Sequence, residues 1–95
     1  MAISSNIRKV LSLLHNARQL AVTHQRRTLA ADVISACHLY AKDIRLPVED
    51  DFFEDLAEGV RGKNNLEMTA MFDRAELEVL AKSDSYPDPV YRDSV

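Results

Sequence analysis

The spacing of apolar residues predicts helices along most of the chain. Between residues 6 and 26 the apolar positions lie alternately three and four residues apart, which is the pattern of one long helix. The apolar arc spans roughly 200° at about 100° per residue, which is wider than a helix on a protein surface needs. This width has two explanations: the helix is central in a bundle, or a second copy of the chain shares it in a homo-oligomer.

A second helix is predicted over residues 29–44. Thr28 is a good N-cap residue, and the helix must end before Pro47 because the residue before a proline avoids helical backbone angles. The expected buried stripe follows the spacing of the apolar residues: Leu29, Val33, Ala36, Cys37, Tyr40 and Ile44.

A third helix is predicted over residues 48–60, with Pro47 fitting its first turn. Its apolar side contains two adjacent phenylalanines. Gly59 and Gly62 are expected to mark its end.

The last helical region, residues 66–82, has apolar residues on two opposite sides. One side holds Met68, Met71, Phe72, Ala75 and Val79, and the other holds Leu66, Ala70, Leu77, Leu80 and Ala81. Either one helix is covered on both sides, or the helix breaks near Asp73. Asp73 and Glu76 have the spacing of a capping box, which supports a break.

Composition points to the same fold class. The chain has 95 residues, 46% of them apolar, with only two glycines and three prolines. This length suits one domain, and the scarcity of turn-forming residues argues against a β-sandwich or barrel. We therefore expect an all-α protein, a small bundle of three to five helices with a long N-terminal helix, over residues 1–82. Residues 83–95 are expected to form an extended, flexible tail.

The residues present disfavour several classes of function. Cys37 is the only cysteine, so an intramolecular disulfide and a zinc knuckle are ruled out, and a reducing compartment is expected. No apolar run exceeds three residues, which predicts a cytoplasmic protein without a membrane span or signal peptide. The chain lacks catalytic motifs and metal-ligand spacings, so we expect no enzyme activity, no cofactor and no metal.

Charge is distributed unevenly along the chain. The formal net charge is −3, but residues 1–45 carry +5 and residues 46–95 carry −8. The two halves can attract each other within one domain, or they can present a basic and an acidic face to different partners.

The most regular charged feature is an acidic face on the third helix. Its five carboxylates lie opposite the phenylalanines with no cation among them: Asp50, Asp51, Glu54, Asp55 and Glu58. Like charges four residues apart repel each other by roughly a few tenths of a kcal/mol, so the pattern is unfavourable on its own. It is typical of a solvated helix face or of a docking surface for a basic protein. Leu39, on the polar side of the second helix, would add apolar contact to such a surface.

The N-terminal half offers a basic alternative. Arg26 and Arg27 precede a helix N-terminus, where free N–H groups favour an anion, and Arg8 and Lys9 would add charge if another chain brought them close. The simpler interpretation is that the arginines pair with the acidic half. Arg18 lies at the edge of the first apolar stripe, so we expect it to form a structural ion pair with a carboxylate of the acidic half.

These features predict a non-enzymatic interaction module: a small adaptor, inhibitor or complex subunit that occludes or bridges a partner surface through its acidic face. Origin in a mobile element that blocks host machinery is a hypothesis for a small acidic helical protein. The alternative function is nucleic-acid binding by the basic N-terminal half, as a dimer. The excess of acidic residues over the whole chain counts against this alternative.

Overall fold

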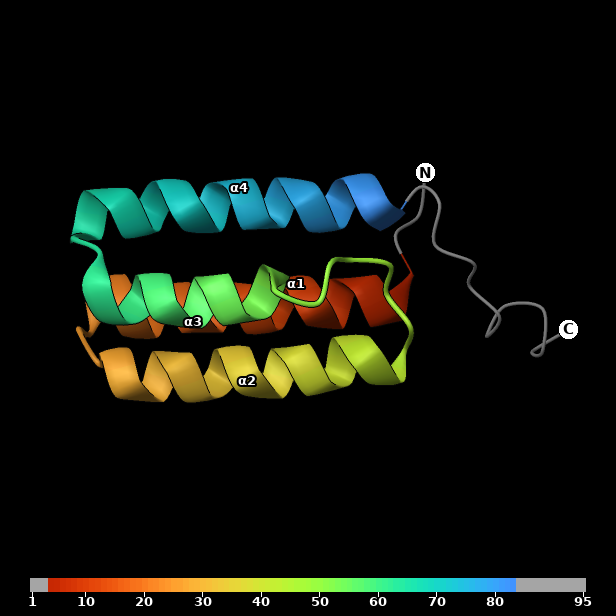
Figure 1. The fold of residues 1–95 in the computed structure, drawn as a ribbon, viewed down its shortest axis with the longest axis horizontal. Coiled ribbons are helices and arrows are strands. Elements are labelled where there is room, and N and C mark those ends of the chain that lie inside the picture. The colour runs from red at the N-terminus through yellow and green to blue at the C-terminus, as the bar shows by residue number, and fades with distance from the viewer. Residues whose placement is uncertain (1–3, 84–95) are drawn as a thin grey trace, which may run out of the picture.

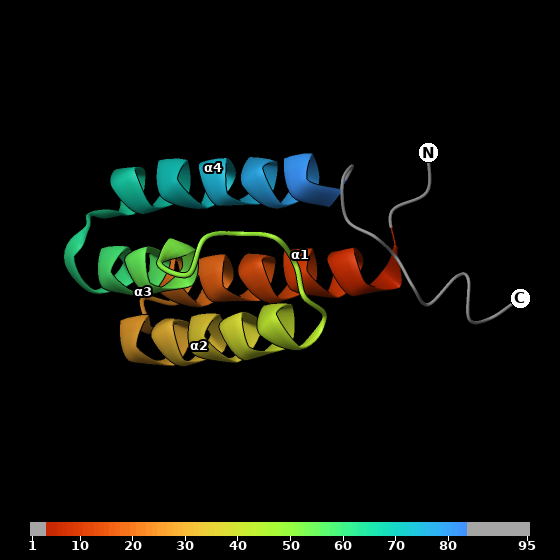
Figure 2. The same cartoon turned by 45° about the vertical axis from the view of Figure 1, so that its right-hand side comes forward.

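The computed structural model describes residues 4–83, which form a bundle of four α-helices without a strand. The elements are α1 (Ser5–Arg18), a π-helical segment η1 (Gln19–Thr23) that continues α1, α2 (Arg27–Asp43), α3 (Phe52–Gly62) and α4 (Asn65–Ser83). The chain runs back and forth, and α1 and α3 lie between α2 and α4 (Figures 1 and 2). The all-α fold class is therefore confirmed, whereas the predicted tail falls almost entirely outside the described residues.

The long first helix is present as α1 and η1. Ser4 caps its start, because the Ser4 hydroxyl accepts a hydrogen bond from the backbone N–H of Ile7 at 3.1 Å. At its end the helix widens, and the N–H of His24 donates to the carbonyl of Gln19, five residues back, at 3.0 Å. Gln25 then adopts a φ of 54° and turns the chain into α2 without the glycine that usually takes this conformation.

The second helix starts earlier than predicted, and the predicted stripe faces the core only in part. Cys37 is buried and Val33, Tyr40 and Ile44 pack against the core, as predicted. Arg26 occupies the N-cap position of α2, so the prediction that Thr28 caps this helix was wrong. Leu29 is 44% exposed and Ala36 is also exposed, although both belonged to the predicted stripe. The side chains that α2 buries are mostly small, which lets the neighbouring helices approach closely: Ala30, Ala31, Ile34, Cys37 and Ala41.

The connection between α2 and α3 explains why the third helix starts later than predicted. Arg45 has a φ of 60°, in the left-handed region. Its N–H donates to the carbonyl of Lys42 at 3.1 Å, and the N–H of Leu46 donates to the carbonyl of Ala41 at 2.9 Å. These bonds form a Schellman helix end, which glycine usually completes. Pro47 therefore lies in the connection and not, as predicted, in the first turn of α3.

The sequence predicted that Gly59 would mark the end of the third helix, but it does not. It is buried inside α3, and a Cβ at this position would clash with the Sδ of Met71. Its missing side chain therefore lets α4 pack closely against α3. Gly62 is the last residue of α3, near the predicted end.

The last helix is continuous, so the break considered near Asp73 does not occur. The capping box lies instead at the start of α4. The side chain of Asn64 accepts from the N–H of Glu67 at 2.8 Å, and the side chain of Glu67 accepts from the N–H of Asn64 at 3.2 Å.

The core lies between the four helices and consists of apolar side chains. The largest fully buried residues are Phe53, Phe72, Ile7, Leu14, Ile34, Met68, Val10, Val60 and Val79. No polar or charged residue within 4–83 is fully buried, so the candidate functional groups of this part lie at its surface. None of its helices is both long enough and apolar enough to cross a membrane.

Candidate functional site

The five carboxylates of the acidic face are all exposed. Asp50 and Asp51 lie in the turn before α3, and the other three lie on α3 itself. Opposite them Phe53 is buried, and Phe52 packs edge-on against it with ring centroids 4.9 Å apart. None of the five carboxylates forms a hydrogen bond or an ion pair with a side chain of residues 4–83.

The start of α3 offsets part of the repulsion between these charges. Glu54 and Asp55 are in the first turn, where the free N–H groups of the helix favour negative charge. Asp51 is the N-cap residue, but its side chain makes no capping hydrogen bond. Glu58 lies one turn further along and gains little from the helix dipole. The local structure therefore accounts for only part of the acidic face.

Four of the five carboxylates border three different hollows. Glu54 and Glu58 line a groove of about 250 Å³ between α2 and α3. Asp55 lines a groove of about 380 Å³ between α3 and α4, and Asp50 lines a hollow of about 210 Å³ beside the connection after α2. This spread over one side of the bundle suits contact with several cations of a partner surface better than it suits one bound ion. Within residues 4–83 no group of three histidine, cysteine or carboxylate side chains could hold a metal.

The groove between α2 and α3 has an aromatic floor. His38 stacks on Phe53 with ring centroids 5.3 Å apart and an angle of 21° between the planes. Arg61 also lines this groove and is the cation placed among its acidic residues. Leu39 is 70% exposed, as expected, but it lines none of the three hollows. The structure therefore does not bring Leu39 together with the carboxylates of the acidic face.

The basic residues of the alternative site do not form one patch. The Nη1 atom of Arg27 donates to the carbonyls of Val60 and Lys63, at 2.7 and 2.6 Å, and so ties the start of α2 to the end of α3. Arg26 is exposed beside it. Arg8 and Lys9 lie near the start of α1, and the starts of α1 and α2 are at opposite ends of the bundle (Figure 1). The Nζ of Lys9 is 5.0 Å from the ring centroid of Tyr40. The capping role of Arg27 could not be predicted from the sequence, because it depends on carbonyls of a distant segment.

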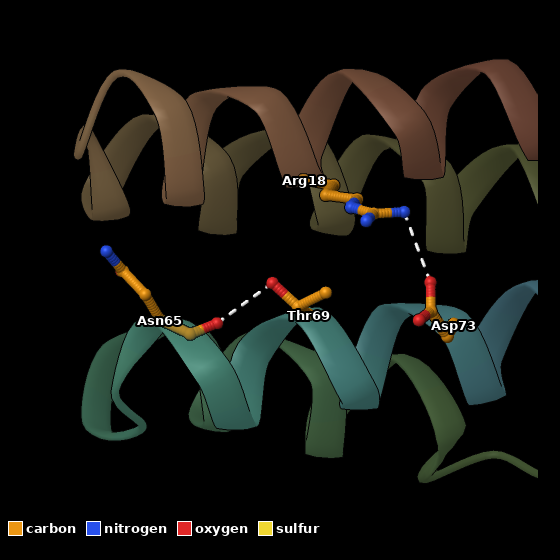
Figure 3. Close-up of polar contacts among 4 residues, drawn as sticks. All are labelled: Arg18, Asn65, Thr69 and Asp73. Atoms are coloured by element: carbon orange, nitrogen blue, oxygen red, sulfur yellow. Dashed lines mark hydrogen bonds and ion pairs between the residues drawn. The ribbon is translucent and has the colours of Figure 1, made fainter.

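Arg18 has a partner in the acidic half, as predicted. Its Nη1 atom donates to Oδ1 of Asp73 at 3.1 Å, from α1 to α4 (Figure 3). The two side chains are 32% and 57% exposed, so this is a surface ion pair and not a buried one. We therefore expect it to contribute little more than about 1 kcal/mol to stability.

The outer side of α4 is an exposed apolar surface. Leu66 is 82% exposed, Leu77 is 66% exposed and Leu80 is 37% exposed, and two exposed alanines, Ala70 and Ala81, lie on the same side. The sequence showed this second apolar side of the helix but left open whether the bundle covers it. We call it the outer face of α4.

Cys37 is fully buried, and its Sγ lies 3.8 Å from the carbonyl oxygen of Val10. Burial raises the pKa of this thiol to about 12. A thiol with such a pKa carries almost no thiolate near neutral pH and is therefore a poor nucleophile.

No family model, curated protein or solved structure matches this chain. Function must therefore be inferred from the surfaces themselves. Two of them stand out: the acidic face around α3 and the outer face of α4.

Proposed function

We propose that this protein is a non-enzymatic interaction module that binds a partner protein with a basic surface through its acidic face. It acts as an adaptor, inhibitor or complex subunit that occludes or bridges the partner surface. The observation that carries the proposal is the lack of side-chain partners for all five exposed carboxylates. Cations of a partner would relieve their mutual repulsion and would speed the encounter of the two proteins.

A cytoplasmic location fits this proposal. The thiol of Cys37 is buried and its pKa is raised, so the residue serves the core and is poorly placed for a disulfide.

Nucleic-acid binding by the basic half receives less support. Arg27 already donates to two backbone carbonyls. Arg8 and Lys9 lie near the start of α1, at the opposite end of the bundle from the start of α2, where Arg26 is the N-cap residue.

The proposal is tested with two triple variants of equal net charge. The first replaces Asp50, Glu54 and Glu58 of the acidic face by lysine. The matched control replaces Asp32, Asp43 and Glu76, which lie on α2 and α4. Each tagged protein is used to capture partners from host lysate with and without nuclease treatment, and the bound proteins are quantified by mass spectrometry.

We expect a stoichiometric partner that the wild type and the control retain and the acidic-face variant loses. With that partner purified, the acidic-face variant should bind at least about tenfold more weakly and with a shallower salt dependence. Equal recovery of the same partners by both triple variants would contradict a role of the acidic face. Loss of every partner after nuclease treatment would favour the nucleic-acid alternative.

A further inference from the structure

The two sides of α4 are both apolar, but the described chain covers only one of them. The inner side packs into the core through Met68, Met71, Phe72, Ala75 and Val79. On the outer face, Leu66 and Leu77 are more exposed than any other large apolar residue of the described chain except Leu39. Both views of the bundle show no other helix on this side of α4 (Figures 1 and 2).

The outer face has the spacing of a helix seam. Leu66, Ala70, Asp73, Leu77 and Leu80 follow one another at intervals of four and three residues. Alternating intervals of this kind bring side chains to one line along a helix and allow two such helices to pack against each other. Because α4 is continuous from Asn65 to Ser83, the line runs along almost its whole length.

We propose that the outer face of α4 binds the same face of a second copy of this chain, with the two helices antiparallel. In an antiparallel seam of this spacing, Leu77 packs against Leu66 of the second copy, and Ala70 packs against Asp73 of the second copy. The arrangement is isologous, so each contact occurs twice about a two-fold axis. A small alanine thus meets the polar residue, and leucines meet leucines on both sides of it.

The charged residues along the edge of the seam support a second copy of the chain as the binding partner and an antiparallel orientation of the two helices. Glu67 and Arg74 lie seven residues apart on one flank of the outer face, so the antiparallel seam sets Glu67 opposite Arg74 of the second copy, twice. A parallel seam would instead bring Asp73 against Asp73. One oxygen of Glu67 accepts from the N–H of Asn64, which leaves the other oxygen for this contact.

Asp73 is the one charged residue on the seam, and Arg18 of the same chain neutralises its charge. The ion pair with Arg18 at 3.1 Å lies at the α1 side of the outer face (Figure 3). The paired carboxylate can therefore approach the second copy with a smaller desolvation penalty than an unpaired one. A polar residue within an apolar seam also favours one register over others.

The first test is the dependence of mass on concentration, measured by sedimentation equilibrium from about 10 μM to about 1 mM. Wild type should shift from monomer to dimer in this range. Leu77→Lys should weaken self-association by at least about tenfold while the circular dichroism spectrum stays unchanged. Leu39→Lys is the matched control, because Leu39 is similarly exposed on a different helix, and it should dimerise as wild type does. A wild type that is monomeric throughout, or a Leu77→Lys variant that dimerises normally, would overturn the proposal.

The second test uses charge to read the register. Arg74→Glu places two glutamates at each flank contact, and Glu67→Arg places two arginines there, so each variant alone should self-associate at least about tenfold more weakly. An equimolar mixture restores both opposite-charge pairs and should form a heterodimer about as tightly as wild type forms its homodimer. A mixture that associates no better than the separate variants refutes the antiparallel register. Because Glu67→Arg also weakens the cap of α4, thermal melts accompany each measurement.

Discussion

The hydrogen bonds of Arg27 provide the sharpest test of how the bundle is held together. One guanidinium nitrogen donates to the carbonyl of Val60 at 2.7 Å and to that of Lys63 at 2.6 Å. These carbonyls lie at the end of α3, where backbone oxygens lack partners within the helix and the dipole favours positive charge. Arg27→Ala removes both bonds and leaves Arg26 in place beside the gap.

The expected loss in the free energy of unfolding follows from the charge of the donor and the exposure of these two hydrogen bonds. A hydrogen bond from a charged group contributes about 1.5–3 kcal/mol. The two bonds here share one nitrogen, and one of them is exposed, so their combined contribution is nearer about 2 kcal/mol than the sum. The Arg27→Ala substitution also removes a positive charge from the start of α2, which returns a few tenths of a kcal/mol. For a domain of this size the net change lowers Tm by on the order of 10 °C.

Arg26→Ala is the matched control. It removes the same charge at nearly the same place, but the Arg26 side chain makes no capping bond. Its expected effect on the free energy of unfolding is within about 0.5 kcal/mol, with the dipole favouring a slight gain. Arg27→Lys keeps the charge but not the reach and planar geometry of the guanidinium, so it should fall between wild type and Arg27→Ala.

The assay is urea unfolding followed by far-ultraviolet circular dichroism at low salt. A lower midpoint with an unchanged slope for Arg27→Ala alone would support the structural role. Equal midpoints for Arg26→Ala and Arg27→Ala would refute it. The result also bears on nucleic-acid binding, because a loss of binding in a variant that combines Arg26→Ala with Arg27→Ala is informative only if the bundle remains folded.

Three further predictions concern the turn after α2 and the buried thiol. Arg45→Gly should raise the free energy of unfolding by about 1 kcal/mol, because Arg45 holds a φ of 60° that glycine adopts without steric cost. Urea unfolding measures this change in stability, and a loss of stability would contradict this view of the turn. The thiol of Cys37, with its pKa raised to about 12, should react with a disulfide reagent in urea but hardly at all in the native protein. The unfolded chain loses the thiol proton near pH 9, whereas the folded chain keeps it up to about pH 12. Cys37 therefore leaves the free energy of unfolding unchanged below pH 9 and lowers it as the pH rises from 9 toward 12. A Cys37→Ala variant should lose less stability over this alkaline range.

The helices could be predicted from the sequence, but their ends only in part. The predicted helix over 6–26 corresponds to α1 and η1, and the helix over 29–44 corresponds closely to α2. The turns after them use Gln25 and Arg45 in the left-handed conformation, where sequence rules expect glycine. Such turns are stabilised by hydrogen bonds and by the anchoring of a neighbouring apolar residue, which a pattern of residue types does not reveal.

The positions of the charged residues could also be predicted only in part from the sequence. The exposure of Glu54, Asp55 and Glu58 follows directly from the helical spacing of Phe53 and its apolar neighbours. Asp50 and Asp51 are also exposed, but they lie in the turn before α3 and not, as predicted, on the helix itself. A carboxylate partner for Arg18 was also predicted, but Asp73 was considered only as a cap for a break in the last helix and not as that partner. Which residues meet across two helices depends on their packing, and the periodicity of each helix alone does not determine it.

The outer face of α4 is the place where the apolar pattern exceeds what the fold requires. The pattern allowed either a break near Asp73 or one helix covered on both sides. A break would have required Asp73 as a cap, but its carboxylate is paired with Arg18 and the helix continues. The inner side alone anchors α4 in the core, while Leu77 remains 66% exposed. Replacing such a residue by lysine should therefore cost the fold little, so its leucine is better explained by a contact outside the chain than by folding.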